Sequence, residues 1–209
     1  MGKMVILVID MLNDFVKEGY NSGAYCARGK NIVPNIRAVI KNALNNDVPV
    51  IYCSDAHRTS DTELTRNHGR WDDHAMDGSE GAQIIKELPR KGILTFHRGQ
   101  SLDAKLDLTG HSLFNVEKGT YSGFYETALD QLLRRLNVGT VCITGLTTDI
   151  CDTHTSAGAF FRGYNIVIIK DCVDAFTKED HERALKNLES SYGAKLKDSK
   201  QVIEEIRRS

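Results

Sequence analysis

The chain has 209 residues and a formal net charge of −1, and 41% of its residues are hydrophobic. This length suits one α/β domain with a sizeable core, and the absence of like-charged blocks argues against a nucleic-acid or membrane surface. The five cysteines lack zinc-ribbon or CxxC spacing, and their odd number excludes a complete disulfide framework. The apolar runs are too short for a signal peptide or a membrane span. We therefore expect a single domain over residues 1–209, located in the reducing cytoplasm.

Apolar runs and helically spaced apolar residues alternate along the chain. Apolar runs predict strands at residues 5–9, 48–53, 93–96, 141–144 and 166–169. Helical spacing predicts helices at residues 32–46, 82–88, 127–136, 152–162 and 181–192, the last being the final element. Residues 55–81 are loop-like, and we interpret residues 97–117 as an insertion. The alternation predicts a three-layer α/β/α sandwich with a mostly parallel central sheet, as in Rossmann-like folds.

Polar or reactive side chains stand at or just beyond the carboxyl ends of four predicted strands. They are Asp10, Asp55, Cys151 and Asp171. Ligands of open parallel α/β sheets bind outside this edge. We therefore expect a functional site there.

Cys151 follows a strand and a short Thr/Asp turn and precedes a predicted helix. The helix dipole at this position lowers a thiol pKa, and nearby backbone N–H groups can hold an oxyanion. A cysteine amidase also needs a base and an electrostatic partner. Asp10, with a pKa raised by burial, suits the first role, and Lys118 suits the second. Each has an ordinary alternative: a buried structural cysteine, a helix cap or turn residue, and a surface lysine.

A second group of residues has the composition of a metal site. Asp55 and His57 directly follow a strand, and His74 comes 17 residues after His57. Side chains two apart at a strand end project to the same side. One carboxylate and two imidazoles suit zinc, iron or manganese. Glu63 and His68 are competing ligands, and a structural or surface role for Asp55 and His57 stays open.

Three segments, in order, resemble motifs of the isochorismatase-like cysteine hydrolases, and among these the nicotinamidase/pyrazinamidase group. The segments are residues 8–15 (VIDMLNDF), 118–124 (KGTYSGF) and 145–151 (GLTTDIC). They are similar to the family patterns D-x-Q-N-D-F, K-x-x-Y-S-x-F and G-x-x-T-x-x-C, and the likeness runs from about residue 4 to residue 195. Leu12 replaces the usual Gln and Thr147 a more usual Ala, which leaves the exact substrate open.

The resemblance implies roles for the residues at the motif positions. Cys151 would be the nucleophile, Asp10 the proton carrier and Lys118 the electrostatic partner. A cis peptide between Leu146 and Thr147 would aim the N–H groups of Thr147 and Cys151 at the oxyanion.

The resemblance also implies a cofactor and a pocket. A divalent metal, with zinc favoured over iron or manganese, would bind the pyridine nitrogen of the substrate and orient its ring. Its implied ligands are Asp55, His57 and His74, and the implied pocket residues are Phe15, Trp71 and Tyr121.

The implied activity is the hydrolysis of nicotinamide to nicotinate and ammonia through a thioester. We expect a homo-oligomeric enzyme that acts on a small-molecule amide. One alternative is a related cysteine hydrolase of another amide or of a carbamoyl or ureido compound. Another is a catalytically silent binding or scaffold protein with the same fold. Isochorismatase activity itself is disfavoured, because hydrolysis of that vinyl ether needs no nucleophilic cysteine.

Overall fold

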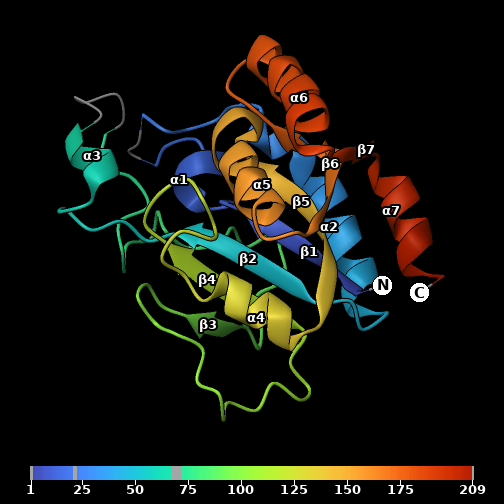
Figure 1. Ribbon diagram of the computed structural model, residues 1–209. Coiled ribbons are helices and arrows are strands. Elements are labelled where there is room, and N and C mark those ends of the chain that lie inside the picture. Colours follow the sequence, from blue (N-terminus) through green and yellow to red (C-terminus); the bar gives the residue numbers. More distant parts are fainter. Residues whose placement is uncertain (1, 21–22, 67–71, 209) are drawn as a thin grey trace.

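The computed structural model describes residues 2–20, 23–66 and 72–208 and confirms the predicted three-layer α/β/α arrangement (Figure 1). One seven-stranded sheet has the order β3-β4-β2-β1-β5-β6-β7, and every neighbouring pair in it is parallel. The strands are β1 (Lys3–Ile9), β2 (Val50–Asp55), β3 (Leu94–Phe96), β4 (Leu113–Lys118), β5 (Val138–Leu146), β6 (Asn165–Asp174) and β7 (Lys195–Lys197).

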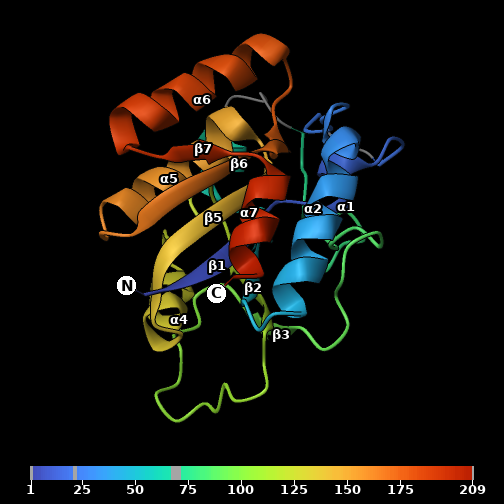
Figure 2. The same ribbon diagram turned by 90° about the vertical axis from the view of Figure 1, so that its right-hand side faces the viewer.

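Helices cover both faces of the sheet. Helices α2 and α7 pack on one face, and α4, α5 and α6 pack on the other (Figure 2). None of the helices in the described ranges has the length and apolar composition needed to cross a membrane. The helices are α1 (Asn13–Val16), α2 (Gly29–Leu44), α3 (Thr62–Arg66), α4 (Leu129–Arg135), the short π-helix η1 (Thr148–Asp152), α5 (Thr153–Phe160), α6 (Lys178–Tyr192) and α7 (Ser199–Ile206).

Burial on both faces explains the continuous apolar run of β1. Ile6 and Val8 pack in the core beneath α2 and α7, whereas Val5, Leu7 and Ile9 pack in the core beneath α4, α5 and α6. Full burial of one such side chain stabilises the fold by about 1.5–3 kcal/mol. The strand is therefore strongly anchored, and the polar residue after it stands on a rigid support.

Residues 82–88, predicted as a short helix, form none. Their backbone pairs instead with the start of the first motif. The Asn13 N–H donates to the Gln83 carbonyl at 3.0 Å, and the Ile85 N–H donates to the Met11 carbonyl at 3.0 Å. The prediction was wrong because these long-range bonds take up the backbone groups that a helix would use internally.

Residues 97–117, interpreted as an insertion, end in β4, which lies inside the sheet between β3 and β2. Asn115 and Glu117 interrupt the apolar pattern of this strand, so the sequence did not reveal it. An insertion therefore stays a prediction only for residues 97–112, which contain no helix or strand. Residues 181–192 are not the final element either, because β7 and α7 follow α6.

Candidate active site

Four side chains meet at the carboxyl edge of the sheet. Asp10 follows β1, Asp55 and Lys118 end β2 and β4, and Cys151 lies in η1 just after β5. Since β4, β2, β1 and β5 are parallel neighbours, their carboxyl ends lie side by side. The predicted gathering of Asp10, Asp55 and Cys151 at this edge is confirmed.

Asp171 does not join this cluster. It lies inside β6, and its carboxylate accepts hydrogen bonds from the Asn35 side chain and from the backbone N–H and hydroxyl of Ser199. These contacts tie α2 and the start of α7 to the sheet. The prediction was wrong because β6 continues well past the apolar run at residues 166–169.

Lys118 is the centre of the cluster. Its side chain is fully buried, which excludes the surface-lysine alternative. Its Nζ atom lies 2.7 Å from Asp10 Oδ2 and 2.6 Å from Asp55 Oδ1. The same atom lies 3.8 Å from Cys151 Sγ. One cation therefore touches both carboxylates and the thiol.

Burial and close charges shift the ionisation of these groups in different directions. Burial and then the neighbouring Asp55 charge raise the pKa of Asp10 to about 6. Burial would also raise the pKa of Asp55, but Lys118 and then His57 hold it well below its usual range. Burial opposes the charged form of Lys118, yet the two carboxylates raise its pKa well above the usual value. Lys118 is thus a permanent cation, whereas Asp10 can gain or lose a proton near neutral pH.

Cys151 differs from the expectation of a lowered thiol pKa. Burial raises its pKa well above the usual value, Asp10 and Asp55 raise it further, and Lys118 opposes them. The expectation was wrong mainly because it left out the burial of the thiol, which is the largest cause of the shift, and it also left out the charge of Asp55. The thiol therefore keeps its proton in this state and needs a base to lose it.

A cis peptide joins Leu146 to Thr147, as the resemblance implied. The backbone just before it is tightly packed: Gly145 has φ +119°, and a Cβ there would overlap the backbone of Ile9. Only glycine fits this left-handed, crowded position. The turn is thus fixed against the end of β1, close to Asp10. The oxyanion role of the Thr147 and Cys151 N–H groups stays a prediction.

The three predicted metal ligands lie together. The ligand atoms of Asp55, His57 and His74 are all within 4.8 Å of one another. His57 Nε2 lies 3.6 Å from Asp55 Oδ2. The Nδ1 atoms of both imidazoles face acceptors, Asp61 Oδ2 at 3.1 Å and the Asp72 carbonyl at 2.8 Å. With Nδ1 occupied in both rings, the Nε2 atoms are the ones that can bind a metal.

Glu63 joins this group as a fourth candidate. Its Oε1 atom lies 3.8 Å from both His57 Nε2 and His74 Nε2. Burial and then the Asp55 charge raise its pKa to about 7. Within the described ranges, His57 Nε2 and Glu63 Oε2 are buried without a hydrogen-bond partner. Two imidazoles, two carboxylates and these unsatisfied atoms fit a divalent metal, which would relieve the cost of burying them. His68, the other competing ligand, lies outside the described residues.

The loop that carries His74 is tied to the first motif. The Ala75 N–H donates to Asp14 Oδ2 at 2.7 Å, and the Asp14 N–H donates to the Gly81 carbonyl at 3.1 Å. A Cβ at Gly81 would overlap the Asp14 carboxylate, so glycine permits this close approach. The link positions His74 beside α1.

The sequence profile of the isochorismatase domain matches residues 4–201. The chain belongs to the isochorismatase family. It is 30% identical over 200 residues to the uncharacterized isochorismatase family protein YaaI of Bacillus subtilis, covering 95% of this chain and 96% of that protein. It is 30% identical over 186 residues to nicotinamidase 3 of Arabidopsis thaliana, with 88% and 79% covered. The crystal structure of N-carbamoylsarcosine amidase from Thermoplasma acidophilum is similar at a TM-score of 0.75 and 29% identity, covering 94% of this chain and 96% of that one.

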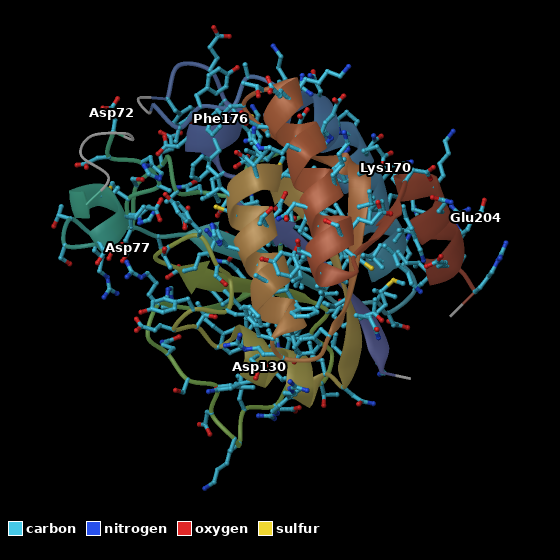
Figure 3. All side chains as sticks on the ribbon, turned by 45° about the horizontal axis from the view of Figure 1, so that its top comes forward. Asp72, Asp77, Asp130, Lys170, Phe176 and Glu204 are labelled. Atoms are coloured by element: carbon cyan, nitrogen blue, oxygen red, sulfur yellow. The ribbon has the colours of Figure 1, made fainter. Side chains whose placement is uncertain are left out.

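These similarities identify an isochorismatase-family cysteine hydrolase, and its Cys151 lines a small pocket. Tyr121 lines this pocket and stacks on His154 with ring centroids 5.5 Å apart. Phe176, in the chain after β6, also lines the pocket. Its label in Figure 3 stands beside the blue ribbon of α1. The remaining lining residues are Asp10, Phe15, Ala24, Asp55, Glu63, His74, Leu146, Thr147, Ile150 and Cys151.

The predicted pocket residues of this isochorismatase-family chain have different outcomes. Phe15 and Tyr121 line the pocket, and the Phe15 ring meets the edge of His74 at a centroid distance of 5.5 Å. Trp71 lies outside the described residues. Phe176, in the chain after β6, and Ile150, in η1, were not predicted, because each is a single apolar residue that no sequence pattern marks.

Proposed function

We propose that this protein hydrolyses nicotinamide to nicotinate and ammonia through a thioester on Cys151. The observation that carries the proposal is the position of two sets of groups on one small pocket. Asp10 and Cys151 line this pocket together with the candidate metal ligands Asp55, Glu63 and His74. A flat ring that carries both a carboxamide and a ring nitrogen suits this arrangement, because the carboxamide can meet the thiol while the ring nitrogen meets the metal ligands.

In the proposed reaction, Asp10 first accepts the Cys151 proton, and Lys118 stabilises the thiolate that remains. The sulfur attacks the carboxamide carbon, and the N–H groups of Thr147 and Cys151 hold the oxyanion. Asp10 then gives its proton to the departing ammonia. Next it takes a proton from water, which attacks the thioester carbon and releases nicotinate and the thiol.

Asp55, Glu63, His57 and His74 would hold a divalent metal, with zinc favoured by the mixed nitrogen and oxygen donors. When bound, this metal would supply a Lewis acid that anchors the ring nitrogen. Phe15 and Tyr121, which line the pocket, would enclose the ring.

A hydrolase of carbamoyl or ureido compounds is the nearest alternative, and the similarity to N-carbamoylsarcosine amidase supports it. Substrates such as N-carbamoylsarcosine carry a carboxylate, which a lysine or arginine in the pocket would recognise. The described lining of the pocket contains neither residue. This favours a neutral amide. A silent scaffold is disfavoured, because such a protein has no need to bury Lys118 between two carboxylates beside a thiol.

The proposal also includes a cytoplasmic location and a homo-oligomeric state. All five cysteines are free, as expected in a reducing cytoplasm. The protein would form a homo-oligomer, and the exposed side chains of Phe161 (76%) and Tyr125 (58%) are candidate contacts.

The test is ammonia release by the purified protein from nicotinamide and, separately, from N-carbamoylsarcosine, with metal analysis of the same sample. Cys151→Ala protein prepared in the same way is the control. Turnover of nicotinamide by wild type only is the expected result. Turnover of the carbamoyl compound alone would move the assignment to the alternative, and turnover of neither substrate would reject the nicotinamidase proposal.

A further inference from the structure

Arg98 reaches the candidate metal site from the segment interpreted from the sequence as an insertion. It follows β3, and its side chain is 21% exposed. Its Nη1 and Nη2 atoms donate to the two carboxylate oxygens of Asp61 at 2.7 and 2.9 Å. Nη1 also donates to the carbonyl of Ala56 at 3.0 Å. A bidentate ion pair of this kind fixes the plane of the carboxylate as well as its position.

Asp61 passes this constraint on to His57. Its Oδ2 atom faces His57 Nδ1 at 3.1 Å and accepts from the Arg58 N–H at 2.9 Å. An ionised carboxylate only accepts hydrogen bonds, so Nδ1 carries a proton toward Asp61, and Nε2 is the ring atom that faces the ligand cluster. A continuous chain of hydrogen bonds therefore runs from Arg98 through Asp61 to His57.

The neighbouring backbone leaves room for the guanidinium. Gly119 directly follows Lys118, and a Cβ at Gly119 would overlap the Arg98 guanidinium. Ala56, whose carbonyl Arg98 binds, stands between Asp55 and His57 in the sequence. Arg98 thus binds two groups: the backbone carbonyl between the candidate ligands Asp55 and His57, and the Asp61 carboxylate that orients His57. Arg98, Asp61 and Gly119 also line a large open cavity, which shares Glu63 and Tyr121 with the pocket.

We propose that Arg98 is a positioning residue for the metal: it fixes Asp61, which in turn fixes the tautomer and direction of the His57 ring. This role rests on the metal site of the proposed function. Arginine suits it because the planar fork meets both carboxylate oxygens at once, whereas a lysine ammonium is a single point of attachment. Loss of an outer partner of this type typically weakens metal binding about 10-fold to 100-fold.

The test is the zinc affinity of metal-depleted and reloaded protein, measured by competition with a chromophoric chelator, for wild type, Arg98→Met, Arg98→Lys and Asp61→Asn. We expect about 10-fold weaker binding for Arg98→Met, a smaller loss for Arg98→Lys and the largest loss for Asp61→Asn. The visible spectrum of the Co²⁺-loaded protein should change in the same order. Arg134→Met is the matched control, because Arg134 lies on α4 over the Tyr164 ring and outside the cluster. Its zinc affinity should equal that of wild type.

Equal zinc affinity in wild type and both Arg98 variants would overturn the role of Arg98. If Arg98→Met does not fold, Arg98→Lys and its cobalt spectrum decide the matter. A wild-type protein that binds zinc but releases no ammonia from nicotinamide would refute the proposed activity, while the affinity comparison would still test Arg98. A wild-type protein that binds no zinc would refute the metal site and the role of Arg98 together, and ammonia release would then test the amidase activity alone.

Discussion

Asp55 and Lys118 are direct cross-strand neighbours in β2 and β4, and their side chains pair at 2.6 Å. The other oxygen of Asp55 lies 3.6 Å from His57 Nε2. One carboxylate therefore serves the thiol cluster with Oδ1 and the candidate metal ligands with Oδ2. The two halves of the site are joined through a single side chain.

Asp55→Asn should consequently affect both halves at once. Removal of the charge takes away a metal ligand and also one of the two anions that hold Lys118. We expect weaker zinc binding together with a changed alkylation rate of Cys151, both measured on the same preparation. His74→Ala is the comparison, because it should weaken zinc binding and leave the alkylation rate of metal-free protein nearly unchanged. An Asp55→Asn protein with altered zinc binding alone would show that the halves are independent.

Cys151 should be the essential thiol. Cys151→Ala removes the only group that can form the proposed thioester, so ammonia release should fall by at least about three orders of magnitude. Cys26→Ala is the matched control, since Cys26 is buried in the core beneath α2 and α7. This variant should keep most of the activity. Mass spectrometry of quenched wild-type protein should detect an acyl adduct on the peptide that contains Cys151. Near wild-type turnover by Cys151→Ala would remove the covalent mechanism.

The acid side of the pH profile should report Asp10. Its pKa is raised to about 6, so the carboxylate is ionised above that pH and protonated below it. A base must be ionised to accept the thiol proton, and kcat/KM should therefore fall as the pH drops through about 6. The measurement is kcat/KM for nicotinamide from pH 4.5 to 8 at constant metal loading. A profile that stays flat down to pH 4.5 would contradict this role of Asp10.

Lys118→Met should reduce both stability and thiol reactivity. It leaves two buried carboxylates without their common cation, and breaking a buried ion pair in this way costs about 3–5 kcal/mol of unfolding free energy. Because Lys118 opposes the rise in the Cys151 pKa, its loss should raise that pKa further. Iodoacetamide alkylation of Cys151 should then need a higher pH than in wild type. Lys118→Arg should restore the charge but not the full rate, since the guanidinium is larger and planar. Identical alkylation curves for wild type and Lys118→Met would show that Lys118 does not affect the pKa of the Cys151 thiol.

Removal of metal should impair substrate binding more than folding. Asp55 stands at the end of a strand whose core is already complete, and His57 and His74 lie in the loops that follow it. Calorimetry of the chelator-treated protein should show a cooperative transition well above room temperature, while the KM for nicotinamide rises. Unfolding of the stripped protein at room temperature would instead indicate a structural metal.

The sequence predicts the sandwich and the gathering of Asp10, Asp55 and Cys151 at one sheet edge, because both depend on local patterns. A continuous apolar run such as residues 5–9 indicates a strand buried on both faces, and the residue after it must emerge at the sheet edge. Asp10, Asp55 and Cys151 were found in this way. Residues 82–88 and β4 were missed because their structure depends on distant backbone partners and on mixed polar and apolar side chains.

The direction of the Cys151 pKa shift was also beyond the sequence. The shift depends on how many charges lie within a few ångströms and on how completely they are buried. Motif spacing gives the identity of Lys118 and Asp10 but not the depth of their burial or the presence of Asp55 beside them. The role proposed for Arg98 was inaccessible for the same reason, since no pattern connects it with Asp61 and His57.

The hydrogen bond from Ala75 to Asp14 has a consequence for the evolution and engineering of this protein. The loop that bears His74 is not an independent module, because its backbone is fastened to a residue of the first motif about sixty positions earlier. A loop transplanted from a relative with another substrate would keep its ligand in place only if it also offered an N–H to Asp14 and a glycine at position 81. Because every residue except proline offers such an N–H, the constraint on a replacement loop is mainly the pairing of Asp14 with glycine at position 81, and a new loop must keep both.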